Sequence, residues 1–133
     1  MADLEIKCEG FTSLAAKLRA VLEDETDKLA KDLAKDYAEL SRKNSPSDDG
    51  ALRNSWSYGT EKLGRHGRVA VIKNDCGYAP YVEHGHRVVV HGKETGKYVK
   101  GEFMAYRARK KIKAGMRKRY SEMAERVQRR MST

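Results

Sequence analysis

The sequence predicts a single α+β domain in which a small antiparallel sheet packs on a long N-terminal helix and a long basic C-terminal helix. Two observations carry this prediction. Apolar residues recur at helical spacing near both ends of the chain, and residues 51–91 between them show strand-like alternation and β-branched runs. The length of 133 residues fits one domain, residues 1–133, with one modest core.

The composition excludes several classes of protein. Hydrophobic residues make up 39% and charged residues 35% of the chain. This hydrophobic fraction is too high for a wholly disordered chain. No apolar run approaches the roughly 20 residues that a membrane span needs, and residues 1–5 do not resemble a secretory signal. Cys8 and Cys76 are two lone cysteines, so we expect reduced thiols in a cytosolic setting. From the lack of a long apolar run we expect no membrane contact.

Charge is distributed unevenly along the chain. Residues 1–50 hold 8 Lys/Arg and 12 Asp/Glu, a net charge of −4, whereas residues 51–133 hold 20 Lys/Arg and 7 Asp/Glu, a net charge of +13. A chain polarised in this way either binds a polyanion or meets copies of itself, acidic part to basic part. Composition alone does not choose between these two partners.

The first long helix is predicted over residues 13–43. Leucines and other apolar residues recur from Leu14 to Leu40 at helical spacing, and Phe11-Thr12-Ser13 is typical of a capped helix start. An extended lead-in, residues 2–10, precedes it. At about 1.5 Å per residue the helix would reach roughly 45 Å, which is too long for so small a core to cover. Either part of its apolar stripe meets another molecule, or the helix is frayed or kinked near Glu25-Thr26.

Three strands are predicted in the middle of the chain. They lie near residues 51–58, 68–73 and 86–91, the first two as an antiparallel hairpin with a longer loop. Between the second and third, Tyr78 to His86 is predicted to form a short buried helix, since Pro80 suits its first turn and Gly85 its end. The residues expected to be mostly buried are Trp56, Val69, Val71, Tyr81, Val82, Val88, Val90 and Ile112.

Residues 91–101 are predicted to form a mobile loop or an extended hairpin tip, because they contain glycines and lysines but only two large apolar residues. The second long helix is predicted over residues 102–130, opened by Glu102, with Gly115 allowing a kink. Between residues 102 and 131 lie 11 Lys/Arg and 3 Glu, which favours a polyanion or an acidic protein nearby. The residues expected to face a partner or DNA are Lys93, Lys97, Tyr98, Lys100, Arg109, Lys110, Lys113 and Arg117.

The sequence contains few features typical of a catalytic site. Cys76, Glu83, His84, His86 and His91 offer metal-ligand side chains, but not at the paired spacings typical of zinc sites. No sequence motif supports a catalytic pair of Cys76 with a histidine. The sequence also contains no nucleophile elbow and no phosphate-binding loop. We therefore predict no catalytic residue, no metal and no cofactor.

Glu83 is expected to be structural rather than catalytic. It lies among apolar residues on the predicted short helix, so its charge needs a partner. Arg53 is the first candidate for that partner and Arg87 the second.

Two segments resemble a known family. Ser45-Pro46 followed by Gly50-Ala51-Leu52-Arg53-Asn54-Ser55-Trp56, and Tyr78-Ala79-Pro80-Tyr81-Val82-Glu83-His84-Gly85-His86, are together similar to the gene-ten-like proteins of tailed phages of the Hong Kong 97 type. Gly101-Glu102-Phe103-Met104, leading into the last helix, extends the resemblance. It covers about residues 45–110.

The resemblance implies a non-enzymatic structural protein that forms a ring at the head–tail interface, joining the phage connector to the tail tube. Its partners would be copies of itself, the connector and the tube, with non-specific contact to DNA in the channel. It would occupy the host cytoplasm during assembly and then the virion. It also implies assembly or structural roles for the residues of its motifs: Arg53, Trp56, Tyr78, Tyr81, Glu83 and Gly85.

Two other interpretations of the sequence stay open. The first is a small basic nucleic-acid-binding protein of a prophage, which the basic last helix favours. The second is a metal-dependent hydrolase that uses the histidine and cysteine residues.

Overall fold

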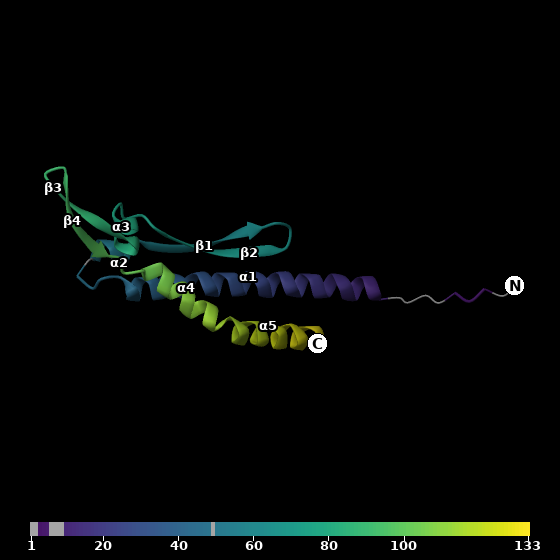
Figure 1. The fold of residues 1–133 in the computed structure, drawn as a ribbon. Coiled ribbons are helices and arrows are strands. Elements are labelled where there is room, and N and C mark those ends of the chain that lie inside the picture. The colour runs from purple at the N-terminus through teal and green to yellow at the C-terminus, as the bar shows by residue number, and fades with distance from the viewer. Residues whose placement is uncertain (1–2, 6–9, 49) are drawn as a thin grey trace.

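The computed structural model describes residues 3–5, 10–48 and 50–133 and confirms the α+β class (Figure 1). A long helix, α1, lies along the molecule, with a β-hairpin on one side and a broken helix on the other. The elements in chain order are α1 (Phe11–Asn44), α2 (Gly50–Asn54), β1 (Trp56–Leu63), β2 (Gly67–Asn74), α3 (Ala79–His84), β3 (Gly85–Val90), β4 (Lys93–Lys100), α4 (Met104–Ala114) and α5 (Met116–Met131).

Helix α1 is unbroken through Glu25 and Thr26, so the predicted helix is confirmed without a break at that point. Gly10 precedes it in a left-handed conformation, and no side chain caps its start, unlike the hydroxyl cap expected there. Its buried stripe begins only at Val21, and every side chain of residues 12–20 is exposed. The helix therefore extends well beyond the part of the chain that covers it. The lead-in predicted for residues 2–10 lies mostly outside the described residues, and residues 3–5 have no regular structure.

The first hairpin runs along α1 (Figure 1). Strands β1 and β2 pair antiparallel from Trp56↔Asn74 to Leu63↔Gly67, so the connection is only residues 64–66. The strand predicted to begin at residue 51 begins at Trp56 instead, because residues 50–54 form the short helix α2. The apolar pair Leu52 and Trp56 is spaced four apart, a spacing that suits a helical turn as well as a strand face.

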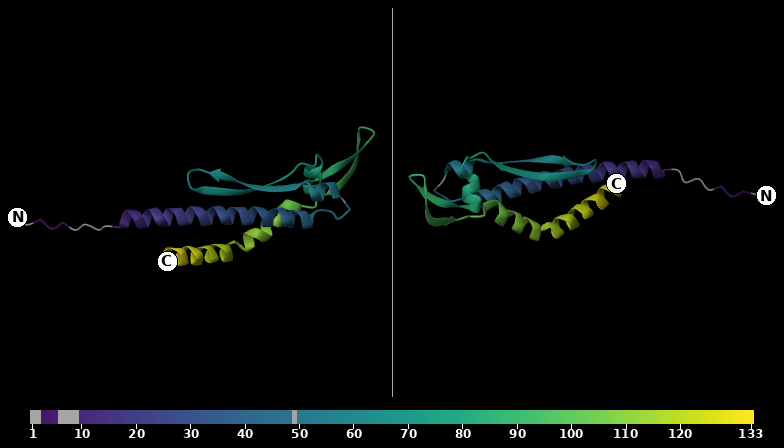
Figure 2. Two further views of the ribbon diagram at one scale, coloured as in Figure 1. Left: turned by 180° about the vertical axis from the view of Figure 1, so that it is seen from behind. Right: turned by 45° about the horizontal axis from the view of Figure 1, so that its top comes forward.

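The third predicted strand does not join this sheet. Strand β3 pairs with β4 to form a second two-stranded hairpin, which corrects the single sheet predicted from the sequence. Of the two alternatives for residues 91–101, the structure has the hairpin: residues 91–92 form its turn and β4 its second arm. Every residue of β4 is exposed, and the hairpin projects from the end of the molecule (Figure 2). A two-stranded hairpin standing alone is only marginally stable in water.

The small core lies where α2, α3 and α4 meet. It consists of Leu52, Ala79 and Met104, and Trp56, Cys76 and Val82 pack against it. The Trp56 indole N–H donates to the Ser45 hydroxyl at 2.8 Å. None of the eight side chains predicted to be mostly buried is fully buried; Trp56, Val71, Val82, Val88 and Ile112 are half-buried, and Val69, Tyr81 and Val90 are exposed. For the five of these residues that lie on strands, the prediction failed because the two hairpins leave one or both faces uncovered.

The C-terminal segment is two helices that meet at Gly115. The first begins at Met104 rather than Glu102, because Phe103 adopts a left-handed conformation with φ of 50°. Met104 and Ala108 anchor α4 against α1. Among the described residues no helix combines the length and the apolar character that crossing a bilayer requires.

We predict that trypsin cuts the free subunit first in the β3–β4 hairpin, after Lys93, Lys97 or Lys100. The exposed hairpin has too little buried surface to remain closed, and a partner surface would order it. Cleavage after Lys35, in the middle of α1, is the internal control, followed by mass spectrometry of the fragments. If the hairpin bonds of a proven monomer survive as long as the Lys35 bond, the hairpin is rigid and the prediction is wrong.

Candidate assembly surfaces

Glu83 closes the N-terminal end of α4. Its two carboxylate oxygens accept hydrogen bonds from the backbone N–H groups of Ala105 and Tyr106, each at 3.0 Å. A carboxylate is favourable there because the first N–H groups of a helix lack intrahelical partners and carry partial positive charge. The predicted structural role thus has a physical basis, but the partner is backbone, neither Arg53 nor Arg87.

Both predicted arginine partners are engaged elsewhere. The Arg53 guanidinium donates to the Arg42 carbonyl near the end of α1, at 3.3 Å. Arg87 pairs with Glu94 across the β3–β4 hairpin at 2.9 Å. Arg53 therefore ties α2 to the C-terminal end of α1, and Arg87 links the two strands of the exposed hairpin.

Gly85 and Gly101 permit the close packing around Glu83. Gly85 has φ of 85°, and a Cβ built there would lie 2.3 Å from the Tyr98 hydroxyl oxygen. A Cβ on Gly101 would lie 2.5 Å from the Glu83 carbonyl oxygen. The Tyr98 hydroxyl in turn donates to the His84 carbonyl at 2.7 Å. The segment from Tyr78 to His86 is therefore a corner that positions α4 and the base of the β3–β4 hairpin.

The two tyrosines of this segment have different surroundings. The Tyr78 carbonyl accepts backbone hydrogen bonds from Tyr81 and Val82 at the start of α3. The Tyr81 ring is 59% exposed and meets the His86 ring edge-on, with 6.2 Å between centroids. Tyr81 is thus available to a partner.

A row of ion pairs joins the acidic side of α1 to α5. Arg126 contacts Glu25 at 2.9 Å, Arg130 contacts Glu25 at 3.0 Å and Asp24 at 2.6 Å, and Arg119 pairs with Asp36. From the sequence, the acidic and basic halves were expected to meet between neighbouring copies. In this structure much of that contact is made within one chain.

The pKa values of this row follow from its contacts. The hydrogen bond from Arg126 lowers the pKa of Glu25, burial opposes it, and a second bond from Arg130 lowers it further. Hydrogen bonds from Arg130 and Lys28 lower the pKa of Asp24. The charged carboxylates are therefore favoured in the folded state.

The predicted partner-facing cations lie in two groups. Lys93, Lys97 and Lys100 lie on β4 beside Tyr98, which is 62% exposed. Arg109, Lys110 and Lys113 on α4, with Arg117 at the start of α5, are also exposed. In the part of the chain that the structure describes, none of these seven cations has a carboxylate within 4 Å. Their charge is free for a partner.

The N-terminal part of α1 carries an uncovered apolar stripe. Leu14, Leu18 and Leu22 are 53%, 39% and 40% exposed, although they repeat every four residues on one face. Beside them is a groove of about 360 Å³ that reaches His66 at the tip of the first hairpin. This agrees with the expectation that α1 is too long for its own core.

The histidines and the described cysteine are scattered. Cys76 packs beside the core, while His84 and His86 lie at the corner and His91 at the hairpin turn. Across residues 3–5, 10–48 and 50–133, no three His, Cys, Asp or Glu side chains lie together so as to hold a metal ion.

Comparison with known protein families identifies the family to which this chain belongs. Residues 11–85 match the HK97-gp10-like family, described as "Bacteriophage HK97-gp10, putative tail-component". This match covers more than half of the chain. No curated protein and no solved structure matched the chain. The chain therefore belongs to the HK97-gp10-like family of phage tail components.

Several residues have structural roles that the sequence did not predict, including Ser45 of the first family-like segment. Asn44 donates to the Met104 carbonyl at 3.0 Å, and Asn74 donates to the Leu52 carbonyl at 3.0 Å. Ser45 accepts from Trp56 and donates to the Ser41 carbonyl. The only signal was position, since these polar residues end α1 and β2, where backbone groups need side-chain partners.

Replacing Glu83 by glutamine should lower the free energy of unfolding by about 1 kcal/mol, because it removes a charge and an acceptor from the α4 terminus. Urea unfolding measures the loss. Glu102→Gln, an exposed acid three residues before Ala105, is the control and should change stability little. Equal stability of the Glu83→Gln variant and the wild type would show that the carboxylate does not hold α4.

Replacing Glu25 by glutamine should reduce stability by about 2 kcal/mol at neutral pH, as expected for hydrogen bonds to charged groups. The folded pKa of Glu25 is lowered, so its contribution is present above the ordinary value of 4.5 and is lost as pH falls through the lowered value. The difference between variant and wild type should shrink in acid.

Urea unfolding of both proteins from pH 7 to pH 3 measures this, with exposed Glu39→Gln on the same helix as control. A difference that stays constant over the whole range would contradict the ion-pair account.

Proposed function

We propose that this protein is a non-enzymatic structural subunit of a phage or prophage that forms a ring at the head–tail interface and joins the connector to the tail tube. The observation that carries the proposal is the family match over residues 11–85. The proposed location is the host cytoplasm during assembly and then the neck or tail of the virion.

The uncovered part of α1 supports an assembly role. An exposed stripe of three leucines, beside a groove, is a surface that gains free energy when a partner covers it. The stripe lies at one end of the molecule and the exposed β3–β4 hairpin at the other (Figure 2). Surfaces at opposite ends suit a subunit that contacts a neighbour on each side, as a ring requires.

The unpaired cations suit the inner surface of such a ring. Seven exposed Lys and Arg side chains on β4, α4 and the start of α5 have no carboxylate within 4 Å among the described residues. They would interact with phosphates of passing DNA without reading sequence. We propose non-specific contact of this kind, with Tyr98 as an anchor for the hairpin.

The same cations favour one alternative function, a small nucleic-acid-binding protein of a prophage. Arg109, Lys110, Lys113 and Arg117 lie close together along α4 and the start of α5. If the isolated subunit binds duplex DNA tightly, with affinity falling steeply as salt rises, the alternative is favoured. A ring subunit should bind weakly until many copies act together.

Replacing Leu18 and Leu22 together by glutamine should block assembly while changing stability by less than about 0.5 kcal/mol, since both side chains are already exposed. The measurement is the ratio of joined particles to free heads and tails in electron micrographs, with the variant supplied in place of the wild type. Leu63→Gln, at a leucine 64% exposed on the first hairpin, is the control. Normal joining by the double variant would overturn the role of α1.

A further inference from the structure

Helix α5 lies on the surface of α1 without a buried residue. None of its side chains is buried, and its apolar residues Met116, Met123, Val127 and Met131 are only half-buried. By contrast α4, the preceding helix, buries Met104 and Ala108 almost completely. The two halves of the C-terminal segment are therefore attached differently: α4 by its core contacts, and α5 by charge together with a thin apolar seam.

The acidic row on α1 provides the specific part of that attachment. Glu25 is only 3% exposed and has two arginines of α5 as partners, while Asp24 and Asp36 take one arginine each from that helix. A buried carboxylate needs such partners, because an unpaired charge is costly to desolvate. Arg119, Arg126 and Arg130 are spaced seven and four apart, so one helix face presents all three. Any helix with this face would satisfy the row.

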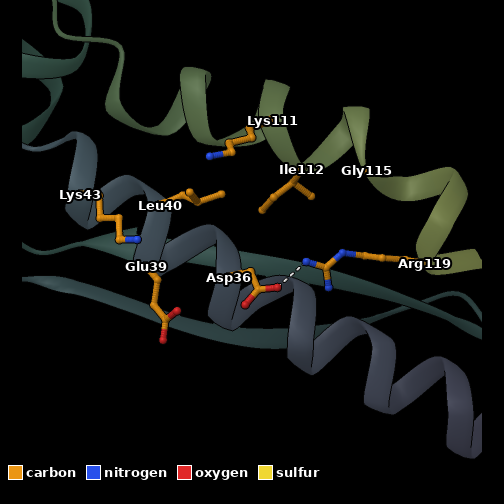
Figure 3. Close-up of a pocket in the computed structure, with 8 residues that line it drawn as sticks. All are labelled: Asp36, Glu39, Leu40, Lys43, Lys111, Ile112, Gly115 and Arg119. Atoms are coloured by element: carbon orange, nitrogen blue, oxygen red, sulfur yellow. Dashed lines mark hydrogen bonds and ion pairs between the residues drawn. The ribbon is translucent and has the colours of Figure 1, made fainter. Parts of the chain in front are cut away.

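The connection between α4 and α5 is one glycine, the residue type with the greatest backbone freedom. Gly115 separates them, and a Cβ built there meets only the Ile112 carbonyl oxygen, at 3.7 Å. A groove of about 290 Å³ lies between α1 and the C-terminal helices. Gly115 is among the residues that line it (Figure 3). The groove is lined by Asp36, Glu39, Leu40, Lys43, Lys111, Ile112, Gly115 and Arg119.

We propose that Asp24, Glu25 and Asp36 form a docking site for α5 of a second copy, and that neighbouring copies exchange their α5 helices across the Gly115 hinge. The exchanged contacts are the same as those within one chain, so exchange loses no ion pair. In a dilute subunit the short tether gives its own α5 an effective concentration near the millimolar range, which keeps the chain closed. Copies held side by side offer each other's α5 at a comparable concentration.

The exchange needs only two adjacent copies and does not rest on the proposed function. Of the two partners that the polarised charge indicated, it accounts for copies of the chain itself, because the same acidic row of α1 would bind α5 in the single subunit and between neighbouring copies. The chemistry of the acidic row also defines what binds it: a basic helix with arginines at positions i, i+7 and i+11, as in α5.

The test uses two complementary variants. Glu25→Arg with Asp36→Arg keeps the basic α5 but loses the site, and Arg119→Glu with Arg126→Glu keeps the site but loses the matching α5. Neither can close on itself through these pairs, so mixing them at low salt should give a complex of twice the subunit mass by light scattering. High salt should dissociate it, because the contacts are between charges.

The matched control replaces two outward arginines, Arg117→Glu with Arg129→Glu, which carries the same change in net charge but leaves the ion pairs to α1 intact. Mixed with Glu25→Arg/Asp36→Arg, it should stay monomeric. Equal pairing in the control mixture, or no pairing of the complementary variants, would overturn the proposal.

A second measurement covers the case in which a reversal variant does not fold by circular dichroism. The Arg126→Lys variant retains the charge, and carbodiimide can couple its introduced amine to the Glu25 carboxylate. In an equal mixture of light and ¹⁵N-labelled protein near millimolar concentration, mixed-isotope cross-linked peptides should form and decline on dilution. Cross-links only between peptides of the same isotope, at every concentration, would show that each α5 stays on its own chain.

Discussion

The carboxylate of Glu83 is the contact on which the C-terminal half of the structure depends. It accepts hydrogen bonds from two N–H groups in the first turn of α4, those of Ala105 and Tyr106, and so fixes the direction in which that helix leaves α3. From there α4 places Met104 in the core with Leu52 and Ala79, and carries α5 back along α1. The β3–β4 hairpin begins at Gly85, two residues after Glu83, and returns to the same corner through the Tyr98 hydroxyl. One short helix therefore orients both the basic helices and the exposed hairpin.

The long helices were predictable from the sequence because a 3.6-residue period repeated over many turns leaves few alternatives. The segment at Leu52 was not, since two apolar residues four apart suit either a helical turn or a strand. For residues 91–101 the sequence left a mobile loop and an extended hairpin tip open, because this Lys- and Gly-rich segment has no apolar pattern of its own and its pairing is supplied by β3. The partner of Glu83 could not be predicted for another reason. It is a pair of backbone N–H groups, and every residue type except proline carries such a group, so the sequence does not mark them. The charge asymmetry indicated that acidic and basic parts meet, but sequence cannot separate contact within a chain from contact between chains.

The fold combines one well-anchored region with three weakly held ones. The core around Leu52 and Met104 secures the corner, while the N-terminal part of α1, the β3–β4 hairpin and α5 bury little. Regions of this kind open and reclose at low free energy, and they are the parts that gain most when a partner covers them. This protein belongs to a tail-component family and leaves both the apolar stripe of α1 and the β3–β4 hairpin uncovered. These features are consistent with a subunit whose exposed surfaces are covered by neighbouring molecules.

Hydrogen–deuterium exchange of the free subunit and of the same protein in assembled particles tests this account most directly. Residues 12–22 of α1 and residues 85–100 of the hairpin should exchange rapidly in the free subunit and become protected on assembly. Residues 26–44, already packed, should change little. Identical exchange of residues 12–22 and 85–100 in the two states would contradict the claim that these surfaces are where the subunit meets its neighbours.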